Sequence, residues 1–162
     1  MFVVKWFVIV LVIVAIAAVA AGQAGLLKGH APANLGVKDG RLRPPSTTPN
    51  SVSSQASLYT DHAMRAQANV SPLPVKGTGP ATIAKIKGIV ESMDGTEVVK
   101  SDPDYLYAQF TTRMMKFVDD TEFWFDPAAN VIQVRSASRL GSKDFDANRD
   151  RIEAIRRRLA AL

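Results

Sequence analysis

Cysteine is absent from the 162 residues of the chain, and histidine occurs only twice, as His30 and His62. The absence of cysteine excludes disulfide bonds, cysteine-ligated metal centres and thiol catalysis. Two histidines are too few for a histidine-rich metal site, and a Ser-His-Asp triad would have to use one of them. The sequence also lacks a dinucleotide-binding fingerprint and a phosphate-binding Walker loop. These absences exclude several large classes of enzyme, and no cofactor is predicted.

A strong excess of one charge is also lacking. The chain has 20 Lys and Arg residues against 15 Asp and Glu residues, so its net charge is +5. This balance supports some attraction to anionic surfaces. The basic residues do not alternate with exposed aromatic residues as they do in proteins that bind single strands, so no nucleic-acid partner is predicted. The length suits one domain and a tail.

The most distinctive segment is the apolar N-terminus. No charged or strongly polar side chain occurs over the 17 residues 6–22, and residues 1–22 are long enough to cross a membrane as a helix. The pattern predicts a transmembrane anchor, with Lys5 and Trp6 at the interface. A cleaved signal peptide is the alternative, because Ala18-Val19-Ala20 fits a small-residue cleavage site.

Both interpretations place residues 23–162 outside the cytoplasm. The chain is then a single-pass membrane protein, periplasmic if bacterial, or a secreted protein if the N-terminus is cleaved. Residues 23–57 are rich in Gly, Pro and Ser and predict an extended tether. Residues 58–162 are predicted to form the globular domain.

Hydrophobic periodicity in this domain predicts two helices and four strands. Pro80 and Gly95 bracket a helix whose apolar residues recur at spacings of three and four. Strands are predicted over residues 96–100, 105–112, 116–125 and 131–139. A last helix begins near Asp146, a residue type typical of N-caps. This order predicts an α+β fold, a four-stranded antiparallel meander covered on one face by two helices.

Charged and hydroxyl side chains are densest between residues 119 and 151. One predicted strand carries Asp119, Asp120 and Glu122, and the following strand and helix add Arg135, Ser136, Ser138, Arg139, Asn148 and Arg149. Strand alternation places Asp119 on the face opposite Asp120 and Glu122. If the two strands form a hairpin, Asp119 and Thr121 can neighbour Arg135 and Arg139, in a register that the sequence does not fix.

These residues resemble those of a known family, the bacterial and plant proteins grouped as domain of unknown function 1499. The resemblance covers about residues 41–160 and rests on 43–45 (RPP), 49–54 (PNSVSS), 117–123 (FVDDTEF), 134–141 (VRSASRLG), Asp144 and 148–152 (NRDRI). The family pattern usually has cysteine where this chain has Ser51, so any thiol role at that position is absent here. The resemblance implies an envelope- or membrane-associated domain and implies no activity.

Three hypotheses about function follow. The favoured one is a non-catalytic envelope domain that binds an anionic small molecule, a lipid headgroup or an envelope protein, because guanidinium groups match such anions. Its predicted ligand-binding residues are Arg43, Asp119, Asp120, Glu122, Arg135, Ser136, Ser138, Arg139, Asn148 and Arg149. The second is a metal-assisted hydrolase that uses Asp119, Asp120 and Glu122. The third is a structural assembly module whose charges form internal ion pairs.

Overall fold

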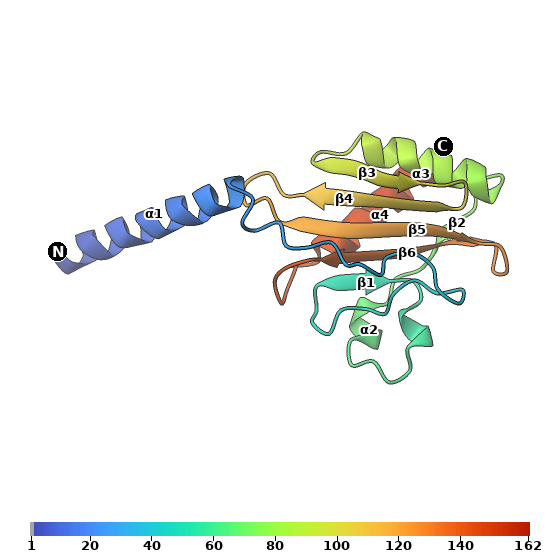
Figure 1. Ribbon diagram of the computed structural model, residues 1–162, viewed down its shortest axis with the longest axis horizontal. Coiled ribbons are helices and arrows are strands. Elements are labelled where there is room, and N and C mark those ends of the chain that lie inside the picture. Colours follow the sequence, from blue (N-terminus) through green and yellow to red (C-terminus); the bar gives the residue numbers. More distant parts are fainter. Residues whose placement is uncertain (1) are drawn as a thin grey trace.

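The computed structural model describes residues 2–162 and consists of one long N-terminal helix and an α+β domain (Figure 1). The helices are α1 (Phe2–Gln23), the 3-10 helix η1 (Ala56–Leu58), α2 (Arg65–Ala68), α3 (Gly79–Glu91) and α4 (Ala147–Ala160). The strands are β1 (Ser51–Ser53), β2 (Leu73–Pro74), β3 (Thr96–Ser101), β4 (Tyr105–Thr111), β5 (Val118–Asp126) and β6 (Val131–Ser138). The predicted α+β class is confirmed.

The strands form one antiparallel sheet with the order β1-β6-β5-β4-β3, in which β2 also pairs with β6. The long strands β3 to β6 form the expected meander. The prediction of four strands missed β1 and β2, which are three and two residues long. Segments this short show no alternation of polar and apolar residues, so pairing with β6, and not their own pattern, makes them strands.

Helices α3 and α4 pack on the same face of the sheet, which we call the helix side. One hydrophobic core lies between them and the sheet, and its fully buried members include Ile86, Val90, Leu106, Phe123, Ile132, Val134, Ile152, Ile155 and Leu159. The Thr78 hydroxyl accepts a hydrogen bond from the Ala81 N–H and caps α3. Gly95, with a φ of +70°, lies against the Thr111 carbonyl, so the turn into β3 requires glycine.

The opposite face, which we call the loop side, is covered by the chain around residues 30–47 instead of by a helix (Figure 1). Leu42 is buried there against Tyr105 and Tyr107 of β4. The Leu42 N–H donates to Gln55 Oε1 at 2.8 Å, and Gln55 Nε2 donates to the Gly40 carbonyl at 3.0 Å. Residues 23–57, predicted as an extended tether, thus pack on the sheet and supply β1.

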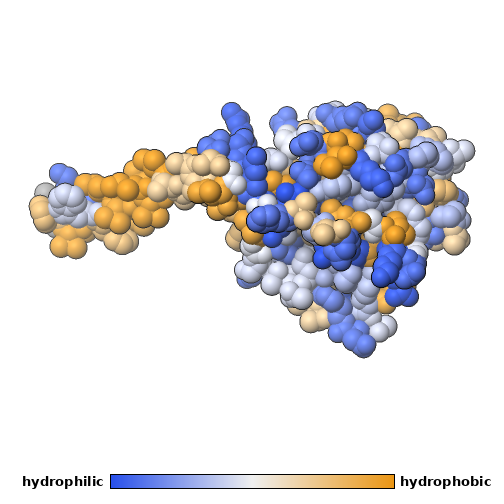
Figure 2. Space-filling model, in the orientation of Figure 1, coloured by the Kyte–Doolittle hydropathy of each residue, from blue (hydrophilic) through white to orange (hydrophobic). Residues whose placement is uncertain are grey.

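Helix α1 projects from the domain as a single apolar rod (Figures 1 and 2). It is long and apolar enough to cross a membrane, and a signal sequence near an N-terminus has the same properties. Met1, the first residue of the predicted anchor, lies outside the described residues. At its C-terminal end, α1 meets the loop between β4 and β5, where Gln23 Nε2 donates to the Met114 carbonyl at 2.8 Å.

Candidate functional site

The predicted polar residues lie on both faces of the sheet. The register of β5 and β6 pairs Asp119 with Ser138 and Glu122 with Arg135. Asp120 and Glu122, and not Asp119, therefore share a face with Arg135 and Arg139. The helix side holds Asp119, Ser136, Ser138 and Asn148, and the loop side holds Asp120, Glu122, Arg135 and Arg139. The sheet separates these two groups.

On the helix side, an ion pair joins β5 to α4. Arg151 Nη2 lies 2.6 Å from Asp119 Oδ2, and Arg151 Nη1 donates to Ser136 Oγ at 3.0 Å and to Asn148 Oδ1 at 2.6 Å. The Arg151 guanidinium also lies over the Phe110 ring, 4.4 Å from its centroid. Charge-assisted hydrogen bonds of this length are strong, so they fix the start of α4 on the sheet.

Asn148 extends this network toward the sheet edge. Its Oδ1 accepts from the Ser136 hydroxyl at 2.5 Å, and its Nδ2 donates to Ser138 Oγ at 3.0 Å and to Asp144 Oδ2 at 2.8 Å. Asp144 Oδ2 also accepts from the Asn148 backbone N–H at 3.1 Å. Asp146 stands at the N-cap position as expected, but its φ is 65° and its side chain makes no capping bond, so Asp144 caps the helix instead.

Two arginines of α4 have roles that the sequence did not predict. Arg149, a predicted ligand-binding residue, donates to the carbonyls of Gln67 at 2.6 Å and Asn69 at 3.0 Å and joins neither group. Arg151, which pairs with Asp119, was not among the predicted site residues. Its spacing of three from Asn148 could have identified it, because residues at this spacing share a helix face.

The helix-side cluster, consisting of Asp119, Thr121, Ser136, Asn148 and Arg151, is neutralised internally. The hydroxyls of Thr121 and Ser136 are 2.7 Å apart, and the one carboxylate meets the one guanidinium. Within residues 2–162, every buried side-chain polar atom of this cluster has a hydrogen-bond partner. The cluster therefore stabilises the fold and offers no free group to a ligand.

On the loop side, Arg139 binds Asp120 in a bidentate manner, with donor–acceptor distances of 2.9 and 2.7 Å. The Tyr107 hydroxyl donates to Asp120 Oδ1 at 2.5 Å and accepts from Gln109 Nε2 at 2.8 Å. Burial and then this hydrogen bond to Asp120 raise the pKa of Tyr107, and hydrogen bonding to Asp120 raises the pKa of Arg139. The Asp120 carboxylate is thus neutralised by its neighbours.

Glu122 and Arg135 form a looser pair at the centre of the same face. Arg135 Nη1 lies 3.8 Å from Glu122 Oε2, and neither atom has a hydrogen-bond partner within residues 2–162. Glu122 Oε1 accepts from the Gly36 N–H at 2.6 Å and from the Tyr105 hydroxyl at 2.8 Å. Arg135 Nε donates to the Pro44 carbonyl at 3.2 Å. Arg135 is only 3% exposed, and yet its Nη1 atom donates no hydrogen bond within the described residues.

Burial dominates the electrostatics of this pair. It raises the pKa of the Glu122 carboxyl, against the lowering effects of the Gly36 N–H, the Tyr105 hydroxyl and Arg135. It lowers the pKa of the Arg135 guanidinium, which the Glu122 charge raises and the positive charge of Arg43 lowers. Burial and then the Glu122 charge raise the pKa of Tyr105. Burial therefore disfavours the ionised forms of both Glu122 and Arg135.

A cavity of about 420 Å³, which we call the loop-side cavity, opens beside this pair. Its charged and imidazole-bearing lining residues are Arg43, Arg135, Arg139, His30, His62 and Asp120. The Arg43 guanidinium has no ion-pair or hydrogen-bond partner in the described part of the chain. Of the described residues, Asp120 is the one acidic residue that lines the cavity, and Arg139 neutralises it. The predicted residues Arg43, Arg135 and Arg139 thus meet at one cavity.

His30 and His62, which line this cavity, were not predicted as site residues. No pattern in the sequence joins them to β6. The chain that covers the loop side brings His30 to the end of β6. Gly29 packs so closely there that a Cβ on it would lie 2.9 Å from Arg139 Cβ. Tyr105 and Tyr107 were also missed as partners of the carboxylates. Strand alternation already placed them together on one face of their strand, and only the pairing with β5 remained unknown.

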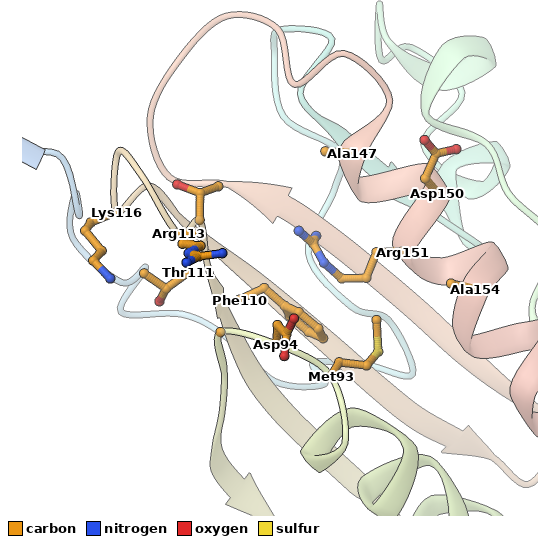
Figure 3. A pocket seen from close by; sticks show the side chains of 12 residues that line it. Met93, Asp94, Phe110, Thr111, Arg113, Lys116, Ala147, Asp150, Arg151 and Ala154 are labelled. Atoms are coloured by element: carbon orange, nitrogen blue, oxygen red, sulfur yellow. The ribbon is translucent and has the colours of Figure 1, made fainter. Parts of the chain in front are cut away.

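A larger, more open groove of about 950 Å³ lies on the helix side, between the end of β4, the β4–β5 loop and α4 (Figure 3). Figure 3 shows Arg151 reaching from α4 into this groove above Phe110. Its remaining charged lining residues are the cations Arg113 and Lys116 and the carboxylates Asp94 and Asp150. Because Arg151 is paired with Asp119, the groove has no excess charge comparable to that around Arg43.

The three carboxylates of the metal-assisted hydrolase hypothesis do not converge. Asp119 lies on the helix side, Asp120 and Glu122 lie on the loop side, and each neighbours a different arginine. In the part of the chain that the structure describes, no group of three His, Asp or Glu side chains is placed to hold a metal ion. The geometry gives this hypothesis no support.

Comparison with known proteins assigns the family. A family profile described as "Protein of unknown function (DUF1499)" matches residues 41–159. The chain belongs to this family. The resemblance seen in the sequence is therefore confirmed, and the match includes Arg43 and β1 together with the rest of the sheet and most of α4. No curated protein and no solved structure gives a significant match.

Proposed function

We propose that this DUF1499 protein is a membrane-associated domain that binds an anionic group in the loop-side cavity through Arg43, Arg135 and Arg139. The observation that carries the proposal is the convergence of these three guanidinium groups at one cavity. Within residues 2–162, Arg43 and the Nη1 atom of Arg135 have no hydrogen-bond partner there. The proposed role is binding and not catalysis.

The charge balance around the cavity supports a negatively charged ligand. Asp120 is already neutralised by Arg139, and burial disfavours the ionised form of Glu122. Arg43 therefore adds a positive charge close to both Arg135 and Glu122, and it forms no ion pair of its own within the described residues. Like charges held together destabilise a fold, and such a local cost is common at binding sites. A phosphate or carboxylate would offset the repulsion and match the planar guanidinium groups.

The remaining predicted residues take different roles in this proposal. Asp120 and Glu122 position Arg139 and Arg135 and do not touch the ligand. Ser138 borders the cavity beside Arg139, but its hydroxyl lies on the helix side, where it accepts from Asn148 Nδ2 at 3.0 Å, so it is not assigned to the ligand. The helix-side residues Asp119, Ser136 and Asn148, and also Arg149, contribute to stability.

The N-terminal helix supports a location at a membrane. We infer that α1 anchors the chain and that residues 23–162 lie outside the cytoplasm, in the periplasm if the protein is bacterial. The ligand is then either the headgroup of an anionic lipid or a free anion. Both sources present the same phosphate or carboxylate chemistry to the arginines.

Isothermal titration calorimetry on the full chain in neutral detergent tests the proposal. The probes are inorganic phosphate, citrate and the short-chain lipid dihexanoyl phosphatidic acid. We expect at least one probe to bind, and Arg43→Gln to weaken it by about tenfold or more, since a hydrogen bond to a charged group contributes about 1.5–3 kcal/mol. Arg41→Gln is the matched control, because Arg41 is exposed on the same segment and does not line the cavity.

The three probes separate the two sources of the ligand. Tighter binding of phosphatidic acid than of phosphate indicates a lipid headgroup, and equal or weaker binding indicates a free anion. Absence of binding for all three probes would overturn the proposal. Binding that is equally strong in the Arg43→Gln protein would also overturn it, because the charge that distinguishes the cavity would then make no contribution.

A further inference from the structure

The C-terminal end of α1 is fixed to the β4–β5 loop, residues 112–117. Gln23 Nε2 donates to the Met114 carbonyl at 2.8 Å and to the Arg113 carbonyl at 3.3 Å. Gly22 is buried, and a Cβ at this position would lie 2.5 Å from the Met115 carbonyl oxygen. The helix backbone therefore rests directly on the loop. The direction in which α1 leaves the domain is set by these contacts.

With α1 as the membrane anchor proposed above, on which this inference rests, the contact determines which end of the domain is nearest to the bilayer. The 22 residues of α1 extend about 33 Å at 1.5 Å per residue, close to the thickness of a hydrocarbon core. Polar residues begin at Gln23, so the β4–β5 loop lies at the level of the lipid headgroups. The loop between β6 and α4 lies at this same end of the domain, whereas the β5–β6 hairpin lies at the opposite end (Figure 1).

Large apolar side chains are exposed in the segments at this end. Phe145 in the β6–α4 loop is 90% exposed, Leu26 just after α1 is 73% exposed, and Met114 in the β4–β5 loop is 65% exposed. Phe145 is the most exposed large apolar residue of the described chain. Its backbone has a φ of 51°, in the left-handed region that bulky residues rarely adopt. An aromatic side chain held outward in this way is suited to the interface between lipid and water.

Residues 24–28, 112–117 and 140–146, which lie at this end, carry an excess of positive charge. Their charged side chains are Lys28, Arg113, Lys116, Lys143, Asp144 and Asp146. Four cations therefore face two carboxylates, a net charge of 4 − 2 = +2, and the Asp144 carboxylate is also turned toward Asn148, from which it accepts hydrogen bonds. On the visible face of the molecule, hydrophilic residues gather where the apolar surface of α1 meets the domain (Figure 2). Basic residues beside exposed apolar ones are typical of surfaces that bind anionic bilayers.

We propose that residues 24–28, 112–117 and 140–146 form a membrane-facing surface that lies on an anionic bilayer. Met114 and Phe145 enter the headgroup region, and the lysines and Arg113 contact the lipid phosphates. The domain is thus held in one orientation and does not move freely on a tether. This inference is independent of the anion site proposed for the loop-side cavity, because it involves none of the three arginines assigned to that site.

The absence of cysteine allows a direct test with single-cysteine variants of the full chain. Met114→Cys and Phe145→Cys are each labelled with an environment-sensitive fluorophore, and the protein is placed in nanodiscs containing anionic lipid. Ala128→Cys is the matched control, because Ala128 is exposed in the turn between β5 and β6 at the opposite end. Lipids that carry a spin label on the headgroup quench fluorophores near the membrane surface.

We expect quenching at positions 114 and 145 to exceed quenching at position 128 by about twofold or more, as for side chains placed at the headgroup boundary. Quenching at 114 and 145 that is no stronger than at 128 would overturn the proposal. Acetylation of lysines in the unsubstituted chain provides a second readout that requires no mutation. Lys143 should react more slowly in anionic than in neutral nanodiscs, and Lys100, at the far end of β3, should react equally in both. Equal rates for Lys143 in the two lipids would contradict the expected contact with lipid phosphates.

Discussion

On the helix side of the sheet Arg151 and Asp119 meet at 2.6 Å, whereas on the loop side Arg135 and Glu122 remain 3.8 Å apart. Both pairs join an element to the same strand, β5, and both are largely buried. They differ in their surroundings. The helix-side pair is completed by Ser136 and Asn148, but the loop-side pair has an unpartnered guanidinium nitrogen and lies near the additional positive charge of Arg43.

We infer from this difference that residues on one face of the sheet stabilise the fold and that residues on the other face bind a ligand. A buried ion pair stabilises a fold when additional hydrogen bonds satisfy its remaining atoms. The helix-side cluster meets this condition, and we assign it to the fold. The loop-side pair does not meet it, and the cavity of about 420 Å³ that Arg135 lines lies beside it. The following predictions test this division, ordered by the size of the expected effect on stability.

Arg151→Met should reduce the free energy of unfolding the most, by about 3–5 kcal/mol, because it leaves the buried Asp119 carboxylate without its partner. Chemical denaturation of the full chain in detergent measures this change. The double variant Asp119→Leu/Arg151→Met should recover part of the loss, since no charge is then left unpaired. A loss below about 1 kcal/mol, the size typical of exposed pairs, would show that the helix-side cluster is not structural.

Arg135→Met should cost less, about 2–3 kcal/mol, because Glu122 keeps its hydrogen bonds from Gly36 and Tyr105. Adding Glu122→Gln should restore most of this stability by removing the unpaired charge. The double variant should still fail to bind the anionic probes. If the restored protein bound them as tightly as the unsubstituted chain, Arg135 would have no role in binding.

The pH dependence of stability should reveal the raised pKa of Glu122. Between its ordinary value and its raised value, the folded state binds more protons than the unfolded state, so stability falls as pH increases. One group can change stability by up to about 1.4 kcal/mol per pH unit over that interval. Glu122→Gln removes this contribution. The melting temperature of the variant, measured relative to that of the unsubstituted protein, should therefore increase as pH rises. Parallel curves for the two proteins would contradict the raised pKa.

Arg43→Gln should have the smallest effect on stability, within about 0.5 kcal/mol of zero, because this side chain has no partner in the described chain to lose. The substitution also removes the repulsion between the charges of Arg43 and Arg135, and this loss of repulsion favours the folded state. The same substitution should have the largest effect on binding of the anionic probes. A large loss of stability in a thermal melt, with binding intact, would reverse the roles that we assign to Arg43.

Much of the fold could be predicted from the sequence because the long elements have regular patterns. Ile83, Ile86 and Val90 recur at helical spacing, and Leu106, Ala108 and Phe110 alternate along a strand. Both patterns correctly indicate the faces buried on the helix side. The strands β1 and β2 have too few residues for such a pattern, and their place in the sheet depends on β6.

The candidate site was less predictable because it depends on tertiary contacts. Asp119, Asp120 and Glu122 could be assigned to alternate faces, but their arginine partners required the register of β5 and β6. The segment of residues 30–47 was harder still, since Leu42 is its one large apolar side chain that is almost fully buried, at 1% exposed, and its sequence has many Gly, Pro and polar residues. Its position follows from specific hydrogen bonds such as that between Leu42 and Gln55, which no composition rule predicts.

Native mass spectrometry of the full chain, extracted gently from its own membranes, tests directly whether the loop-side cavity holds an anionic ligand. We expect a non-protein mass bound to the unsubstituted protein, retained in Arg41→Gln and absent in Arg43→Gln. The same spectra report whether residues 1–22 are still attached. An unliganded mass for the unsubstituted protein, or a bound mass that persists in Arg43→Gln, would contradict the claim that the loop-side cavity is an anion-binding site.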